Sequence, residues 1–152
     1  MTNSNVIQPI DRNQAARSTG ALGQTHRLRS VGAVVAGLVG IFAVTTGVDL
    51  VMHATGVFPQ LGAPPMSHAL FLLAFAYRFA IDVAGSWLTA RLAPRRPLHH
   101  ALVLGAIGTV LSIAGAVAMW DANRAWYPLA LAASALPCAW LGGRLVERRA
   151  VR

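Results

Sequence analysis

Four apolar runs, each about as long as a bilayer core is thick, constrain the fold of this chain more than any other feature. They cover residues 31–54, 67–92, 99–120 and 126–145. A helix needs about 20 apolar residues to cross the hydrocarbon core. Backbone polar groups in lipid must be satisfied within the protein, by a helix or a closed barrel. The sequence therefore predicts an all-α protein, a polytopic membrane four-helix bundle.

Composition excludes most soluble classes of protein. Of 152 residues, 55% are hydrophobic and 12% are charged, which is too apolar for a soluble domain of this size. The net charge of +8 comes from arginines that flank the apolar runs. Membrane topology explains these arginines better than phosphate binding does, so we expect no nucleic-acid partner. The single cysteine, Cys138, lies inside an expected span and implies no disulfide framework.

The two ends of the chain differ from its apolar middle. Residues 1–30 are polar and rich in Gly, Ser, Asn and Gln, which predicts a mostly disordered cytoplasmic tail. The apolar run that follows is longer than the core of a signal peptide, so we expect an uncleaved first span. The sequence thus predicts a four-helix transmembrane domain over residues 31–146 and a basic cytoplasmic end over residues 147–152.

The distribution of arginines predicts the orientation. The N-terminal tail carries four, the second connection three and the C-terminal end four, whereas the first connection has none and the third has one. Basic residues in short loops stay on the cytoplasmic side. We therefore expect a multi-pass protein of the cell inner (plasma) membrane, with both termini cytoplasmic and the lipid bilayer as a partner.

A motif at the end of the second span recurs at the end of the fourth. The pattern W-L-x-x-R-L-x-x-R-R occupies residues 87–96 and again residues 140–149. Two duplicated helical hairpins of the same orientation would produce this recurrence, as in parallel-repeat transporters. Chance likeness between Ala/Gly/Leu-rich spans, with arginines set by topology, would produce it too. The sequence leaves both origins open.

Small residues share one face of the first span and one face of the third. Small residues let membrane helices approach closely and gain packing energy without a hydrophobic drive. We interpret these faces as the helix-packing seam of the bundle, in preference to a ligand groove. The residues are Gly37, Gly40 and Gly47 in the first span, and Gly105, Gly108, Ser112 and Gly115 in the third.

Charged residues inside the expected spans form the candidate site. Arg78 and Asp82 are four residues apart and share a helix face near mid-span. An unpaired charge there costs at least about 2.5 kcal/mol on insertion scales, which favours pairing. Helical side chains lean toward their own N-terminus, so Arg78 leans toward Asp49 at the outer end of the first span. We predict an intramembrane polar cluster of Asp49, Arg78 and Asp82, with His53 one turn beyond Asp49.

Two interpretations of this cluster remain open. If the hairpins are duplicated, the counterparts of Asp49, Arg78 and Asp82 are Val117, Leu131 and Ala135. The fold then does not need the charges in both halves, which favours binding or proton movement. The alternative is a structural salt bridge that locks two helices together.

No motif in the sequence specifies a catalytic or metal site. His99 and His100 are adjacent and point about 100° apart on a helix, a poor arrangement for one metal. Ser134 and Cys138 lack a nearby base that would activate a nucleophile. We therefore expect no cofactor, no metal and no enzymatic activity.

Several short segments carry a resemblance to a known class of protein. They are Ala76-Tyr77-Arg78, Thr89-Ala90-Arg91-Leu92-Ala93-Pro94, His100-Ala101, Trp126-Tyr127-Pro128 and Ala139-Trp140-Leu141-Gly142-Gly143. Together they resemble a family of small, uncharacterised four-span bacterial inner-membrane proteins, over about residues 31–146. The resemblance implies a membrane location and transfers no activity.

Three functional hypotheses follow. The leading one is a structural or interaction protein, such as an accessory membrane subunit, in a homo-oligomer or a larger membrane complex. The alternative is a small solute or proton-coupled transporter that uses the intramembrane Asp/Arg cluster. An intramembrane enzyme ranks third, because no nucleophile and base can be paired.

Overall fold

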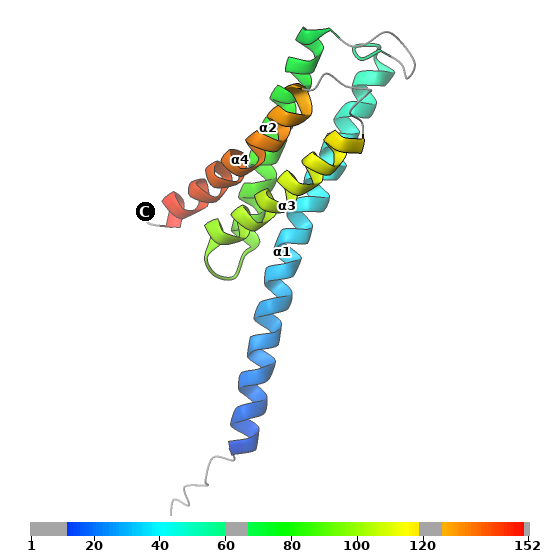
Figure 1. The fold of residues 1–152 in the computed structure, drawn as a ribbon. Coiled ribbons are helices and arrows are strands. Elements are labelled where there is room, and N and C mark those ends of the chain that lie inside the picture. The colour runs from blue at the N-terminus through cyan, green and yellow to red at the C-terminus, as the bar shows by residue number, and fades with distance from the viewer. Residues whose placement is uncertain (1–11, 60–66, 119–125, 151–152) are drawn as a thin grey trace, which may run out of the picture.

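The computed structural model is an all-helical bundle (Figure 1) and describes residues 12–59, 67–118 and 126–150, with side chains over 27–59, 67–118 and 126–149. The helices are α1 (Arg12–Ala54), α2 (His68–Leu92), α3 (Pro97–Ala118) and α4 (Trp126–Ala150). No strand occurs in these described ranges. The prediction of an all-α four-helix protein is confirmed.

Each helix contains a segment long and apolar enough to cross a membrane. The segments are Arg27–Ala54, His68–Leu92, Pro97–Ala118 and Trp126–Arg149. They agree with the four expected spans, with boundaries shifted by a few residues. The agreement follows from length and apolarity, the two properties on which the prediction was based.

Helix α1 begins at Arg12, well before the expected span. Residues 12–30 are therefore helical, where the sequence predicted a mostly disordered tail. Once a helix is nucleated, each further residue adds a hydrogen bond at small cost, and the Gln, Ala and Arg residues of this segment are good helix formers. The remainder of the expected tail, residues 1–11, lies outside the described part of the chain.

A tight connection joins α2 to α3. Helix α2 ends before Pro94, and Pro97 is the first residue of α3, a position where the missing N–H of proline is harmless. Between them, Arg96 has a left-handed backbone with φ 50°. Its carbonyl accepts hydrogen bonds from the N–H groups of His99 (3.0 Å) and His100 (3.4 Å). The short connection makes α2 and α3 run antiparallel, and the two helices contact each other across the bundle.

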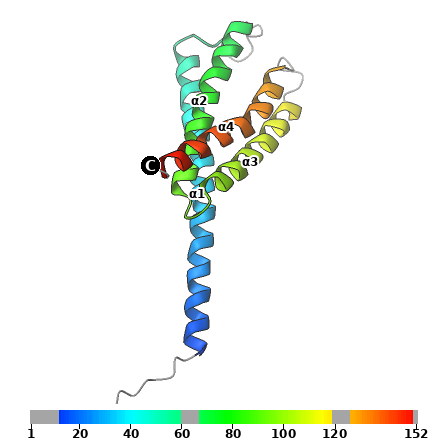
Figure 2. The ribbon, with the colours of Figure 1, turned by 90° about the vertical axis from the view of Figure 1, so that its left-hand side faces the viewer.

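Around the bundle the helices follow the order α1, α2, α4, α3. The α3–α4 pair has the most extensive contact, α2 touches all three other helices, and the described parts of α1 and α4 do not meet. Figure 2 shows that α3 and α4 diverge from α1 and α2, so that the two pairs of helices are farther apart at one end of the bundle. We call that end, where α1 ends and α4 begins, the far half, and the end with the α2–α3 connection the basic half.

Glycines bring the helices together in the basic half. A Cβ placed at Gly142 of α4 would lie 2.6 Å from the backbone N of Trp87 and 2.7 Å from the carbonyl O of Val83, both in α2. A Cβ at Gly105 of α3 would lie 2.5 Å from the Cβ of Ala139 in α4. The predicted seam residue Gly37 packs against Thr89, with the carbonyl O of Gly85 3.2 Å from its Cβ position. Only glycine fits at these crossings.

The same small-residue faces are open in the far half. A Cβ at Gly40, Gly47 or Gly115 would meet nothing within 4 Å, and one at Gly108 would find only the Cβ of Ala135, at 3.9 Å. These glycines do not make the close helix contacts that the sequence predicted. Their spacing places them on one helix face, but α3 leans away from α1 at this end, so no neighbour reaches them.

The recurring motif adopts the same local geometry at both of its positions. The Arg91 guanidinium lies over the Trp87 ring at 5.2 Å, and the Arg144 guanidinium lies over the Trp140 ring at 5.3 Å. Such cation–π contacts hold a guanidinium against an amphipathic ring. The ends of α2 and α4 are therefore alike in structure as well as in sequence.

Candidate functional site

A cavity of about 690 Å³ lies among the four helices in the far half. Every helix contributes to its wall. Its polar and small lining residues include Thr45 and Asp49 of α1, Arg78 and Asp82 of α2, Gly108 and Ser112 of α3, and Ala135 of α4. All four predicted seam positions of α3 thus border a hollow, although the sequence predicted a packed interface there: Gly105, Gly108, Ser112 and Gly115.

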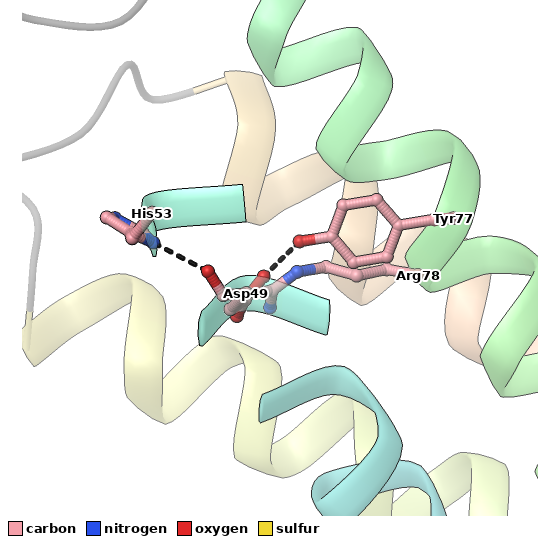
Figure 3. A network of polar contacts seen from close by, with 4 residues as sticks. All are labelled: Asp49, His53, Tyr77 and Arg78. Carbon is pink, nitrogen blue, oxygen red and sulfur yellow. Dashed lines mark hydrogen bonds and ion pairs between the residues drawn. The ribbon is translucent and has the colours of Figure 1, made fainter. Parts of the chain in front are cut away.

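An ion pair joins α1 to α2 on the cavity wall. Arg78 Nη2 lies 2.5 Å from Asp49 Oδ2, and the Tyr77 hydroxyl donates a hydrogen bond to Asp49 Oδ1. Figure 3 shows Tyr77 and Arg78 extending side by side from α2 toward Asp49. Both carboxylate oxygens are therefore occupied. We call these three residues the clamp.

The clamp is partly shielded from the surroundings. The Arg78 and Asp49 side chains are 31% and 28% exposed. The Nε of Arg78 is buried and has no hydrogen-bond partner. Charge-assisted hydrogen bonds are about twice as strong as neutral ones. The clamp thus fastens α1 to α2 at a level where the α1 glycines make no close contact.

His53 lies near the clamp, but it does not contact the Asp49 carboxylate as the predicted cluster would suggest. Its Nδ1 donates to the backbone carbonyl of Asp49 at 2.8 Å, one turn earlier in α1 (Figure 3). Its ring meets Phe58 edge-on, with centroids 5.5 Å apart. His53 also borders the cavity and is exposed. It therefore occupies the rim of the site.

Asp82 borders the same cavity but is not part of the clamp. The sequence suggested an Arg78–Asp82 pair, yet among the described side chains Arg78 forms its ion pair with Asp49, and Asp82 forms no ion pair. The reason is the direction of the Arg78 side chain, which leans toward the N-terminus of α2 and away from Asp82. Asp82 feels the charge of Arg78 only at longer range.

Sequence reasoning missed Tyr77 as a member of the site. The only signal was a polar-tipped aromatic residue beside a mid-span arginine, and a buried Tyr hydroxyl usually finds a partner. It also missed an aromatic cluster of buried residues that lines the far end of the cavity. The ring centroids of Phe71 of α2 and Tyr127 of α4 lie 5.0 Å apart. The cluster also contains Phe58 and Ala74. The cluster connects α2 to α4 beyond the clamp.

The cavity reaches the surface between α1 and α3. Phe42 of α1 and Leu111 of α3 both line it, yet they are 73% and 54% exposed. These two helices are the least closely packed neighbours around the bundle. Because α1 and α3 are apolar on their outer surfaces, this opening faces hydrocarbon when the bundle is embedded in a bilayer.

Some positions of the first hairpin line the cavity together with their repeat counterparts in the second hairpin, but others do not. Arg78 and Asp82 of α2 line it, and so do their counterparts in α4, Leu131 and Ala135. In α3, Gly108 and Gly115 line it, whereas their counterparts in α1 are absent from the lining and lie in open space. The correspondence that the repeat predicts therefore extends to α2 and α4, and does not extend to the glycine faces of α1 and α3.

The nucleophilic side chains are engaged by the backbone. Ser134 Oγ donates to the carbonyl of Leu131 at 3.0 Å, and the buried Cys138 Sγ donates to the carbonyl of Phe79 at 3.8 Å. Within the described ranges, no three His, Cys, Asp or Glu residues gather as a metal site would require. The chemistry that the site can perform therefore depends on its charged side chains.

Those charges divide into a compensated pair and a single carboxylate. Asp49 and Arg78 compensate each other in the clamp, while Asp82 borders the cavity without an ion pair among the described residues. The arrangement can attract a cation or exchange a proton at one defined carboxylate. No protein family model, no curated protein and no solved structure matches this chain.

Proposed function

We propose that this chain is a small membrane carrier that binds a cationic, largely apolar molecule in its cavity, with Asp82 as the counter-charge. The single observation that supports this most strongly is the position of Asp82, on the wall of a 690 Å³ cavity and without an ion pair among the described residues. Arg78 does not repel a cation strongly, because Asp49 already compensates its charge.

Charge balance supports a cationic ligand over an anionic one. Two carboxylates and one guanidinium line the cavity, which leaves a formal charge of −1 when all three are ionised. An uncompensated charge at membrane depth is costly, so Asp82 must be neutralised by a proton or by a bound cation. Competition between the two at one carboxylate is the simplest means of coupling solute movement to proton movement.

The size and walls of the cavity fit an organic ion. Its volume falls in the range of small-molecule sites, about 300 to 1,000 Å³. Phe58, Phe71 and Tyr127 present aromatic surfaces, which attract organic cations. The opening between α1 and α3 would let a lipophilic molecule enter from the bilayer.

We extend the proposal to location and orientation. Most arginines with described side chains lie at the basic end, which by the positive-inside rule would be cytoplasmic. On this proposal both termini are cytoplasmic, and the protein lies in the inner membrane of a bacterial cell. These arginines are Arg27, Arg29, Arg91, Arg95, Arg96, Arg144, Arg148 and Arg149.

Binding of tetraphenylphosphonium to the purified protein in phosphatidylcholine nanodiscs tests the ligand class. We expect saturable binding by calorimetry, weakened about 10- to 100-fold by Asp82→Asn, because a charged contact contributes about 1.5 to 3 kcal/mol. Glu147→Gln is the matched control, since it removes a carboxylate outside the cavity. Equal binding to the Asp82→Asn variant and the parent protein would refute the proposed role of Asp82.

Flux into proteoliposomes separates a carrier from a binding protein. A proton-coupled carrier should take up tetraphenylphosphonium faster when protons flow outward, in exchange for the cation. Asp82→Asn should abolish this acceleration. Binding without flux would reject transport while retaining the ligand site.

A second candidate, an accessory subunit, is supported by the length of α1. The backbone of α1 before Arg27 projects beyond the other helices at the basic end (Figure 1, Figure 2). A projecting helix suits a contact with a second copy of the chain or with another subunit. Deleting residues 1–26 should remove such partners from the purified complex, whereas a carrier should keep its tetraphenylphosphonium binding.

A further inference from the structure

A second hollow, of about 380 Å³, lies at the basic end between α1 and the α2–α3 connection. Its lining residues are Arg27, Ser30, Val31, Pro94 and Arg95. Both views show this connection beside α1 (Figure 1, Figure 2). We propose that this hollow binds the phosphate of an anionic membrane lipid.

The hollow combines two arginines with a mostly apolar lining surface. Arg27 and Arg95 come from different elements and border one hollow. Guanidinium groups bind phosphate through two parallel hydrogen bonds, and two of them can hold a single phosphate from different sides. Val31, which is 62% exposed, and Pro94 add an apolar surface that a glycerol backbone or the start of an acyl chain can cover.

The local charge is strongly positive and uncompensated. No carboxylate lines the hollow, and among the described side chains neither Arg27 nor Arg95 forms an ion pair. Arg91 and Arg144 at the same end differ, because each lies over a tryptophan ring. Arg27 and Arg95 are therefore two arginines that border one hollow and that form no ion pair among the described side chains.

The hollow lies at the depth of lipid headgroups. Arg27 begins the membrane-length segment of α1, and Pro94 and Arg95 lie between the membrane-length segments of α2 and α3. Trp87 and Trp140 are near this end of their helices, as is typical of a membrane interface. The hollow and the cavity share no lining residue, so this site does not depend on what the cavity binds.

Native mass spectrometry of the detergent-purified protein tests the site. Phosphatidylglycerol, phosphatidylcholine and inorganic phosphate are titrated separately, so that a lipid can be distinguished from a free anion. Arg27→Gln with Arg95→Gln should weaken phosphatidylglycerol retention about 25-fold, taking about fivefold for each arginine near a headgroup. Arg148→Gln with Arg149→Gln removes the same charge from the same end but outside the hollow, and should weaken retention less than threefold.

Three results would overturn the proposal. Equal losses in the two double variants would mean that phosphatidylglycerol is attracted by diffuse charge and not by this hollow. Equal retention of phosphatidylcholine, or binding of inorganic phosphate as tight as that of the lipid, would remove the anionic lipid as the ligand. Both arginines are exposed, so the fold should tolerate their loss. The single Arg95→Gln variant, expected to lose about fivefold, permits the same comparison if the double variant is not monodisperse.

Discussion

The basic half and the far half of this bundle are built from similar residues but are held together by different interactions. In the basic half, glycines let backbones touch, as at Gly142 against Trp87 and Val83. In the far half, Gly47 and Gly115 face open space, and α1 is fastened to α2 by the ion pair of Asp49 and Arg78. The first half is closely packed, and the second contains a cavity that opens to the surface.

The difference shows how a small bundle of apolar helices can combine a stable fold with a hollow site. Helices in lipid gain little from burying apolar surface, so they need close packing or polar contacts. Close packing in one half leaves the other half free to diverge around a cavity. The clamp and the aromatic cluster then connect the divergent helices without filling the space between them.

The largest expected effect comes from filling a glycine contact in the basic half. Gly142→Val would force its side chain into the backbone of α2, and overpacking of this kind costs about 1 to 3 kcal/mol or more. We expect a loss of folded protein, or a clear drop in the free energy of unfolding by steric trapping. Gly47→Val, the matched control in the far half, should be nearly neutral; equal losses would erase the contrast between the halves.

Breaking the clamp should have the next largest effect. Arg78→Leu leaves Asp49 without its counter-charge, and Asp49→Leu does the converse. We expect each to lower the free energy of unfolding by about 2 kcal/mol, because a charge is stranded at membrane depth. The double variant Asp49→Leu with Arg78→Leu should recover most of that loss, and failure to recover would indicate that the clamp is not primarily structural.

Removing the Tyr77 hydroxyl should cost less. Tyr77→Phe deletes one hydrogen bond to Asp49 while Arg78 still compensates the carboxylate. A loss of about 1 kcal/mol in the free energy of unfolding is expected. Asp82→Asn should change it by less than about 0.5 kcal/mol, as substitutions outside structural contacts do. A larger loss at Asp82 than at Tyr77 would assign Asp82 to the structural network.

Two further substitutions should raise stability. Gly47 and Gly115 lie in helices, where alanine is favoured over glycine by about 1 kcal/mol, and a Cβ there meets nothing within 4 Å. Gly47→Ala and Gly115→Ala should each raise the melting temperature slightly. A decrease would show that these glycines contact a lipid or a second chain in the membrane.

The fold could be predicted from the sequence because span length and apolarity are local properties of the chain. The Asp49–Arg78 contact could also be anticipated, because a mid-span charge needs a partner and its side-chain direction is known. The cavity could not be anticipated. Gly37 and Gly47 share a helix face, yet only Gly37 meets a neighbour. The angle at which α3 leaves α1 decides this, and that angle depends on contacts between residues far apart in sequence.

Thiol accessibility along α3 tests the contrast between the halves most directly. In a Cys138→Ala background, single cysteines replace Ser112, which borders the cavity, and Ala101, which is fully buried in the basic half. Membranes are then treated with 2-aminoethyl methanethiosulfonate, a small cationic reagent. We expect rapid labelling at position 112 and none at position 101, with tetraphenylphosphonium protecting position 112. Equal labelling at both positions, or none at 112, would contradict an accessible cavity in the far half.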